Sequence, residues 1–230
     1  WISKTYTITY DLAGGTHGTT HPDTYNVDSN TITISDPTRN GYTFNGWTIT
    51  TAPTTWGSGS STSGAKNFKI ATGTYGNIKL TARWTPNTIT LNWDENNGTA
   101  ISNGSCTYDG NLVLPAAAVR SGYTFAGWKL ANGTVKSVSE TVTNGCTNTY
   151  TGVYSGTSTS IQAQWTPITY TITYNLNEGT NPDGAPTSYT IETNTITLPT
   201  PTKSGYTFAG WFASSDLSGS AVTQIAKGST

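Results

Sequence analysis

GYTFNGW, residues 41–47, is the stretch that decides the fold, because it returns as GYTFAGW at residues 122–128 and again at residues 205–211. The three copies start 81 and 83 residues apart, at positions 41, 122 and 205. Such a period is too long for most solenoid repeats. It suits a string of small domains, each large enough to bury a modest core of its own.

Two further motifs recur in the same order. An opening motif starts at residue 6 (YTITYDLAGGT), residue 87 (NTITLNWDENNGT) and residue 170 (YTITYNLNEGT). A closing motif reads ARWTP at residues 82–86 and AQWTP at residues 163–167, and Trp1 matches the last Trp of a preceding copy. We therefore predict three domains, at residues 1–85, 86–167 and 168–230, with the closing strand missing from the third.

The third copy runs to Thr230 without a closing Trp-Thr-Pro. A repeat without its closing strand presents an unpaired sheet edge and an exposed apolar groove. We expect the natural chain to continue, because terminal repeats need capping. The alternative is that a neighbouring molecule supplies the strand.

Alternation of apolar and polar residues predicts strands rather than helices. Apolar side chains alternate with Thr and Asp over residues 6–12, the pattern of a half-buried strand. Proline ends the second strand of each copy, at positions 37, 115 and 199. The third strand begins after the turn at Gly41, Gly122 or Gly205. Because no helical period is present, the fold class is mainly β, at most α+β.

The spacing inside the third strand leaves one question open. Trp47 stands three residues after Phe44, so strict alternation places the two rings on opposite faces. A bulge at Gly46 would return Trp47 to the face of Phe44.

Composition excludes several classes of protein. Only 10% of the residues are charged and the net charge is -1, so no basic stripe is present to follow a nucleic acid backbone. No apolar run approaches the roughly 20 residues that a membrane-spanning helix needs, so we expect no membrane insertion in this segment. The 33% of apolar residues suits several small cores rich in Trp and Tyr.

Aromatic residues that return in every copy are predicted to build the core, because each copy must build the same one. These are Tyr42, Phe44, Trp47, Trp84, Tyr123, Phe125, Trp128, Trp165, Tyr206, Phe208 and Trp211. Trp56 has no counterpart and lies in an insertion of the first repeat. It is the one candidate for a surface contact; the alternative is that its loop packs onto its own domain.

Catalytic and metal-binding patterns are absent from the sequence. His17 and His21 are the two histidines, and Gly18 and Pro22 argue against the helix that would align them on a metal. Asp94 begins an acidic turn without the spacing of a calcium loop. No nucleophile–base set or phosphate loop occurs. We expect no enzyme activity, no catalytic residue, no metal and no cofactor.

Cys106 and Cys146 both fall in irregular segments of the second repeat, and we expect them to form a disulfide. Closing a loop of this length contributes roughly 3–4 kcal/mol of stability, and an exported location permits the bridge. The alternative is two separate buried thiols.

These motifs resemble the Listeria–Bacteroides repeat, also called the internalin-type B repeat. Its pattern is an opening YTVTF-like strand, a turn of small residues, a strand ending near proline, GYTFAGW, and a closing strand ending in Trp. The resemblance covers nearly the whole chain. It implies β-grasp-like repeats, here linked by short Thr-Pro connections into a semi-rigid rod, and a secreted protein of the bacterial cell surface.

The expected function is therefore a stalk or adhesin region that spaces or mediates cell-surface contacts. Its expected partners are neighbouring repeats of the same or an adjacent chain, and a host or cell-surface protein or glycan. One alternative is the subunit of an extracellular filament, assembled when another molecule completes the third repeat. A second alternative is a carbohydrate-binding module that uses loop aromatics such as Trp56.

Overall fold

The computed structural model describes residues 1–158 and 161–230, which form two compact units. The first unit consists of Trp1–Asn92, Asn103–Val113 and Thr141–Ile161. The second consists of Trp93–Ser102, Leu114–Glu140 and Gln162–Thr230. Residues 86–167, the predicted second domain, contribute to both units.

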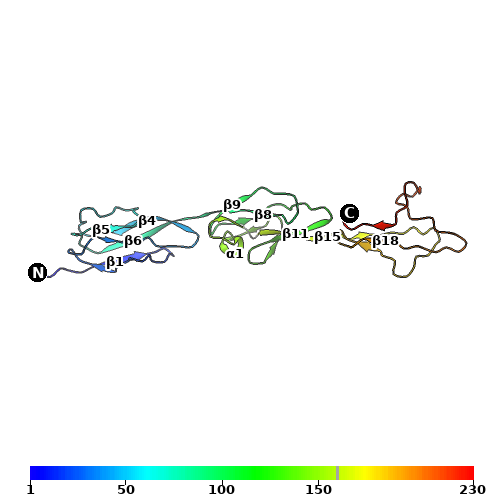
Figure 1. The fold of residues 1–230 in the computed structure, drawn as a ribbon. Coiled ribbons are helices and arrows are strands. Elements are labelled where there is room, and N and C mark those ends of the chain that lie inside the picture. The colour runs from blue at the N-terminus through cyan, green and yellow to red at the C-terminus, as the bar shows by residue number, and fades with distance from the viewer. Residues whose placement is uncertain (159–160) are drawn as a thin grey trace. The chain divides into compact units, whose positions relative to one another are not determined.

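Short strands make up nearly all of the regular structure (Figure 1), which confirms the prediction of a mainly β fold. The strands before residue 93 are β1 (Tyr6–Asp11), β2 (Thr24–Tyr25), β3 (Ile32–Thr33), β4 (Tyr42–Thr51), β5 (Lys69–Ile70), β6 (Ile78–Pro86) and β7 (Thr88–Leu91). Those of residues 93–167 are β8 (Trp93–Asp94), β9 (Gly104–Thr107), β10 (Leu112–Val113), β11 (Tyr123–Lys129), β12 (Val135–Lys136), β13 (Thr141–Val142), β14 (Gly156–Thr157) and β15 (Ile161–Pro167). Those after residue 167 are β16 (Tyr170–Thr171), β17 (Ser188–Tyr189), β18 (Ile196–Thr197) and β19 (Gln224–Ile225). Among the described residues the one helix is α1 (Asn148–Thr151), a single turn that ends on Gly152.

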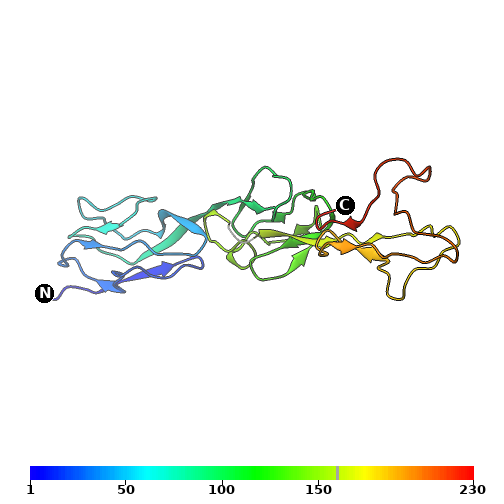
Figure 2. The ribbon, with the colours of Figure 1, turned by 45° about the vertical axis from the view of Figure 1, so that its right-hand side comes forward.

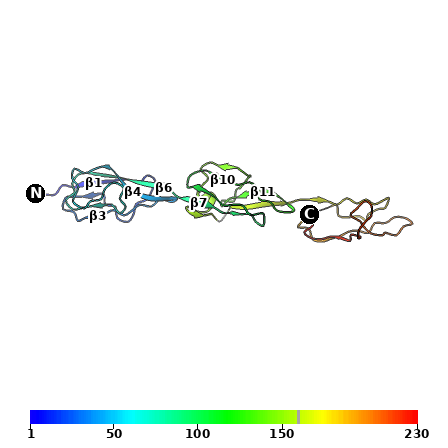
Figure 3. The ribbon, with the colours of Figure 1, turned by 90° about the horizontal axis from the view of Figure 1, so that it is seen from above.

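The first repeat forms a mixed sheet in the order β2-β1-β6-β4. Its strands β1, β4 and β6 are labelled in Figure 3. β1 runs parallel to β6 and antiparallel to β2, while β4 runs antiparallel to β6. A parallel pair requires a long crossover between its strands, and residues 12–77 provide it. Side chains of alternate residues along β6 are buried, so Ile78 and Leu80 join Ile8 and Trp47 in one core.

A bulge in β4 answers the question left open by the spacing of Phe44 and Trp47. The register against β6 shifts between these two residues, and Gly46 takes a φ of +102°. Phe44 and Trp47 are 8% and 1% exposed, and their ring centroids lie 5.5 Å apart in an edge-to-face arrangement. The bulge therefore turns both rings into the same core. Gly127 and Gly210 have the same left-handed backbone in the other two copies.

The second repeat contributes separate ladders to the two units. In the first unit, β7 pairs with β9 antiparallel and with β14 parallel, and β10 pairs with β13. In the second unit, β11 pairs with β15 and β12, and its register against β15 shifts between Phe125 and Gly127 as in β4. This ladder buries Trp128 completely.

The third repeat carries only two-residue strands, β16 with β17 and β18 with β19 (Figure 2). Residues 205–210 form no strand, so the prediction of a Tyr-Thr-Phe-x-Gly-Trp strand is wrong for this copy. The physical reason is that β4 and β11 are held by the closing strands β6 and β15, and no third Trp-Thr-Pro follows residue 211 in this sequence. Phe208 is 37% exposed as a result.

Gly46 offers a direct test of the bulge. A Cβ added there would lie 2.0 Å from the carbonyl oxygen of Gly64, in addition to the left-handed φ. We expect Gly46→Ala to lower the free energy of unfolding by about 2–4 kcal/mol in urea titrations of the whole chain. The matched control is Gly59→Ala, which has a φ of +90° but open space around the added Cβ, with an expected loss of about 1 kcal/mol. Equal losses would contradict the assigned role of the bulge.

Candidate interface between successive repeats

The turn before β4 meets a turn of the second repeat within the first unit. Asn87 N donates to Gly41 O at 2.8 Å, and Tyr108 N donates to Asn87 O at 2.8 Å. The Tyr42 hydroxyl donates to Asp109 Oδ2 at 2.6 Å, a short bond to a carboxylate oxygen. The rings of Tyr42 and Tyr108 pack edge to face with centroids 5.7 Å apart. These contacts join the first two repeats directly.

Arg39 and Gly41 shape the first-repeat side of this junction. The Arg39 guanidinium lies 3.6 Å from the centroid of the Tyr42 ring, close enough for a cation–π contact, and its Nη1 donates to Ala13 O at 2.9 Å. Gly41 has a φ of +79°, and a Cβ there would lie 2.3 Å from the Tyr108 ring. The turn therefore needs glycine for both its backbone and its close approach to the next repeat.

Several of these contacts return between the second and third repeats, within the second unit. Ile168 N donates to Gly122 O at 2.9 Å, and the Tyr123 hydroxyl donates to Glu192 Oε1 at 2.9 Å. The Arg120 guanidinium lies 3.9 Å from the Tyr123 ring centroid. A Cβ on Gly122 would lie 2.6 Å from Cδ1 of Ile191. Glu and Ile take the places of Asp109 and Tyr108.

We call this arrangement the clasp. Its tyrosine side consists of a cation, a glycine and a tyrosine: Arg39, Gly41 and Tyr42, then Arg120, Gly122 and Tyr123, then Lys203, Gly205 and Tyr206. Its acid side is a four-residue turn, at residues 26–29, 107–110 and 190–193, closed by a backbone bond of 3.1, 2.8 and 3.0 Å respectively. The two central residues of these turns are Val27 and Asp28, Tyr108 and Asp109, and Ile191 and Glu192.

The disulfide braces the acid side of the first clasp. Cys106 and Cys146 are bonded, with Cα atoms 6.0 Å apart. Asp109 N donates to Cys146 O, and Cys146 N donates to Gly110 O, both at 2.9 Å. The bridge therefore holds the buried Cys146 beside the turn that carries Asp109.

A shallow polar pocket lies beside the first clasp. Its lining residues are Gly14, Thr16, Thr38, Arg39, Asn40, Tyr42, Tyr108 and Asp109. Two of its polar side chains, Tyr42 and Asp109, already bind each other across the clasp.

The predicted core aromatics are buried to different extents in the structure. Phe44, Trp47 and Trp128 are buried, whereas Tyr42 and Tyr123 are half-buried in the clasps and Tyr206 is 73% exposed. The indole nitrogens of the closing tryptophans, Trp84 and Trp165, donate to carbonyl oxygens of Leu12 and Glu95 beyond the opening strands. Phe125 packs against both Trp128 and Trp165, and Trp211 retains its contacts with Phe208 and Tyr174.

The tyrosine's role in the clasp was missed by the sequence reasoning, although a signal exists. An acidic residue stands 14 positions before the tyrosine of GYTF in every copy, as Asp28 before Tyr42, Asp109 before Tyr123, and Glu192 before Tyr206. Each clasp joins the tyrosine of one copy to the acid of the next, 67 residues later at Tyr42 and 69 at Tyr123.

The remaining candidates occupy structural positions. Trp56 is half-buried and packs against Phe68 with ring centroids 6.0 Å apart, so its loop lies on its own domain. His17 and His21 stack on each other with centroids 4.1 Å apart. Within residues 1–158 and 161–230 no cluster of three or more His, Cys, Asp or Glu side chains could hold a metal ion.

The described residues thus define a class of protein: a tandem array of small β repeats whose recurring polar contacts join one copy to the next. The chain belongs to the Listeria-Bacteroides repeat domain family, which it matches at residues 6–83, 90–156 and 170–230. This confirms the three tandem copies.

One curated relative is a protein of Evansella cellulosilytica named "Putative membrane protein". It is 24% identical over 220 residues, which cover 92% of this chain and 28% of the relative. The chain therefore spans less than a third of the length of that protein. No solved structure matches the chain. In the part of the chain that the structure describes, no helix has the length and apolar character to cross a membrane.

The hydrogen bond between Tyr42 and Asp109 leads to a prediction about the titration of Tyr42 at high pH. The hydrogen bond to Asp109 raises the pKa of Tyr42 above its usual value of 10.0, so the neutral hydroxyl is favoured in the folded chain. The stabilisation is fully present below pH 10 and is lost as the pH rises through the raised pKa. We expect Asp109→Asn to shift the titration of Tyr42 to lower pH.

The measurement is the tyrosinate absorbance of each chain as a function of pH. Subtracting the curve of the same chain carrying Tyr42→Phe leaves the titration of Tyr42 alone. Asp183→Asn, which changes an exposed carboxylate of the third repeat, serves as the control and leaves the curve of Tyr42 unchanged. An identical Tyr42 curve with Asp109→Asn would remove the bond as the cause.

Proposed function

We propose that this chain is a non-enzymatic spacer region of a bacterial surface protein, in which clasps between β-grasp-like repeats limit rotation at each junction. The observation that carries the proposal is the clasp itself, which occurs at both junctions with the same chemistry. The family supports a surface location, because its repeats are typical of bacterial surface proteins. The parallel pairing of β1 with β6 in a mixed sheet supports the β-grasp-like description.

The short links support a semi-rigid arrangement. Pro86 and Pro167 end β6 and β15, and the first backbone bonds of the clasps follow at once, at Asn87 and Ile168. A link of this kind has little backbone freedom, because proline restricts its own φ and the residue before it. Contact with a host or cell-surface protein or glycan remains part of the proposal for the whole protein, of which this chain supplies the spacing.

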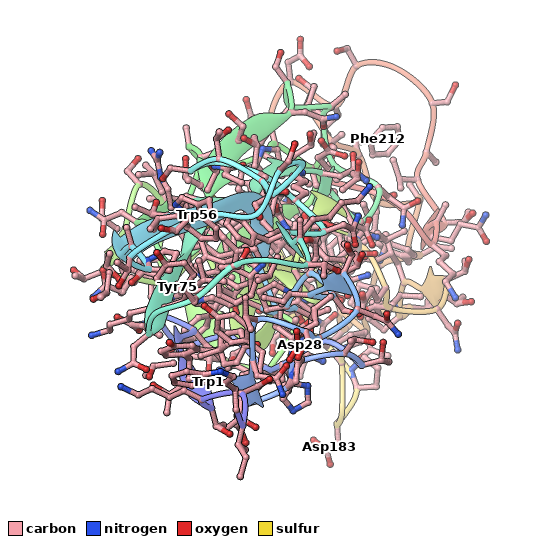
Figure 4. The ribbon with its side chains drawn as sticks, turned by 90° about the vertical axis from the view of Figure 1, so that its left-hand side faces the viewer. Trp1, Asp28, Trp56, Tyr75, Asp183 and Phe212 are labelled. Atoms are coloured by element: carbon pink, nitrogen blue, oxygen red, sulfur yellow. A yellow bond between two sulfur atoms is a disulfide. The ribbon has the colours of Figure 1, made fainter. Side chains whose placement is uncertain are left out.

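Removing one hydroxyl tests the spacer function. We expect Tyr42→Phe to cost about 1 kcal/mol of coupling between the first two repeats while leaving the ring in place. Nuclear relaxation measurements on the whole chain will then show the first repeat tumbling more independently of the second. Tyr75→Phe is the control, because Tyr75 is an exposed tyrosine (labelled in Figure 4) that makes none of the contacts described for the clasps. Independent tumbling of the unmodified repeats would refute the spacer function.

A second candidate is filament assembly by strand complementation, favoured by the absence of a strand at residues 205–210. A peptide with the sequence of residues 77–86 should bind the whole chain and slow amide exchange at residues 205–211. A peptide in which the tryptophan is replaced by alanine should bind at least tenfold more weakly, because it lacks the indole that Trp84 uses. If neither peptide slows exchange, strand complementation is rejected.

Carbohydrate binding gains no support from the loop aromatic that suggested it. Trp56 is partly buried and packs against the core of its own domain, beside Phe68. We therefore do not propose it as a sugar-stacking platform.

A further inference from the structure

The two histidines of the sequence lie in one loop, between β1 and β2, and their rings stack on each other. The ring centroids of His17 and His21 are 4.1 Å apart, with 16° between the ring planes. His21 Nδ1 lies 2.8 Å from Gly18 O. A carbonyl oxygen only accepts, so Nδ1 carries the hydrogen and Nε2 is the nitrogen at which His21 takes up a proton. His17 also packs edge-on against Tyr10, with ring centroids 5.1 Å apart.

The loop is hydrogen-bonded to the segment that leads into the first clasp. Thr16, the residue before His17, exchanges two backbone bonds with Thr38: Thr16 N donates to Thr38 O at 2.7 Å, and Thr38 N donates to Thr16 O at 2.9 Å. Arg39 follows Thr38 directly, and its Nη1 donates to Ala13 O at 2.9 Å. The loop that carries the histidines therefore holds the cation of the first clasp on two sides.

Arg39 in turn begins the tight turn of that clasp. Tyr42 N donates to Arg39 O at 3.1 Å, which closes the turn. Gly41 O, inside the turn, accepts from Asn87 N at 2.8 Å, the first backbone bond between the two repeats. A continuous path of hydrogen bonds therefore runs from the histidine loop to the junction.

The third repeat builds the same loop without histidine. Each residue that shapes the loop has a counterpart 164 positions later: Tyr10 and Tyr174, Ala13 and Asn177, Thr16 and Thr180, Pro22 and Pro186, Thr38 and Thr202, Arg39 and Lys203. In both repeats the tyrosine hydroxyl donates to the proline carbonyl, the threonines exchange two backbone bonds, and the cation donates to the carbonyl oxygen. Asn181 and Ala185 take the places of His17 and His21. The imidazoles are therefore not needed to form the loop.

Four other titratable or charged groups lie on the elements around the pair: Tyr10 on β1, Asp23 at the end of the loop, and Asp36 and Arg39 on the paired segment. Burial raises the pKa of Tyr10, so its hydroxyl stays neutral while histidine titrates. Asp36 Oδ1 accepts from Asn67 N at 2.6 Å, and Arg39 is bound to the loop backbone. Asp23 is the carboxylate that acts on His17.

These groups set the direction of the pH effect. Partial burial, and then the neighbouring His21, lower the pKa of His17 below its usual value of 6.5, while Asp23 opposes the shift. The folded loop thus holds a proton at His17 less readily than the unfolded chain does. The stabilisation is fully present above pH 6.5 and is lost as the pH falls through the lowered pKa. Two protonated rings in such a stack also repel each other.

We propose that the stacked pair of His17 and His21 makes the first junction acid-sensitive: uptake of protons separates the rings, loosens the loop from Thr38 and weakens the first clasp. The proposal rests on the clasp as the joint of the proposed spacer, and it adds a condition under which one joint loosens. The second junction contains no histidine, so it keeps its contacts over the same range of pH.

The experiment is amide hydrogen exchange of the whole chain, followed by nuclear magnetic resonance at about pH 7.5 and about pH 5, on either side of the range in which histidine titrates. The quantity compared is the protection factor, the exchange rate relative to that of an unstructured chain at the same pH. Asn87 N reports on the first clasp and Ile168 N on the second. We expect the protection factor of Asn87 to fall about threefold or more in acid and that of Ile168 to stay unchanged.

The matched control is the double variant His17→Asn with His21→Ala, which carries the residues of the third repeat. Its Asn87 should be as protected as in the unmodified chain at the higher pH, and should keep that protection in acid. The proposal is overturned if Asn87 and Ile168 lose protection equally, if Asn87 loses none, or if the loss persists in the double variant. A double variant with unprotected Asn87 at the higher pH would overturn it too, because the imidazoles would then be needed to form the loop.

Failure of the spacer function gives a different result. If Asn87 of the unmodified chain is unprotected at both pH values, the clasp does not hold, and the spacer function and the proposal fail together. Protection that is present at the higher pH and persists in acid rejects the acid sensitivity alone.

Discussion

The antiparallel ladder between the GYTF strand and the closing strand is the constraint on which each repeat depends. Where β6 or β15 is present, the GYTF segment is extended, the glycine bulge forms, and Trp47 or Trp128 is buried completely or almost so. Residues 205–210, with the same sequence as 122–127, form no strand. Gly205 and Gly210 keep φ values of +78° and +138°, close to those of Gly122 and Gly127, so the third copy differs in lacking the ladder and the burial that a partner strand supplies. Pairing rather than intrinsic preference therefore decides where this sequence forms a strand.

Much of the fold was predictable because it follows from local patterns. The alternation over residues 6–12 and the recurrence of three motifs indicated β repeats, and both are confirmed. The side of the sheet on which Trp47 lies was not predictable. It depends on the bulge at Gly46, where the backbone of Gly64 lies too close for any side chain. The loss of the strand at residues 205–210 could not be predicted from those residues, which match their paired counterpart; its signal is the lack of a third closing motif.

The clasp shows why recurrence alone cannot separate a core residue from an interface residue. Every copy must build the same core, but every copy in a tandem array must also build the same junction. Tyr42 recurs for the second reason, and its exposure to the next repeat emerges only when the acid of that repeat is placed beside it. The disulfide could be predicted from the sequence, but its role beside the clasp could not. That role depends on the backbone hydrogen bonds of Cys146 with Asp109 and Gly110, which only the fold brings together.

The bridge between Cys106 and Cys146 has a consequence for a chain pulled from its two ends. It closes a loop of 40 residues, so this stretch cannot lengthen even when the second repeat is unravelled by force. The extension gained on unravelling is shortened by roughly 140 Å, the span of such a segment when fully stretched. Under a pulling force this repeat would therefore lengthen less than the other two, and the tension would pass through the bond between the two sulfur atoms rather than through hydrogen bonds.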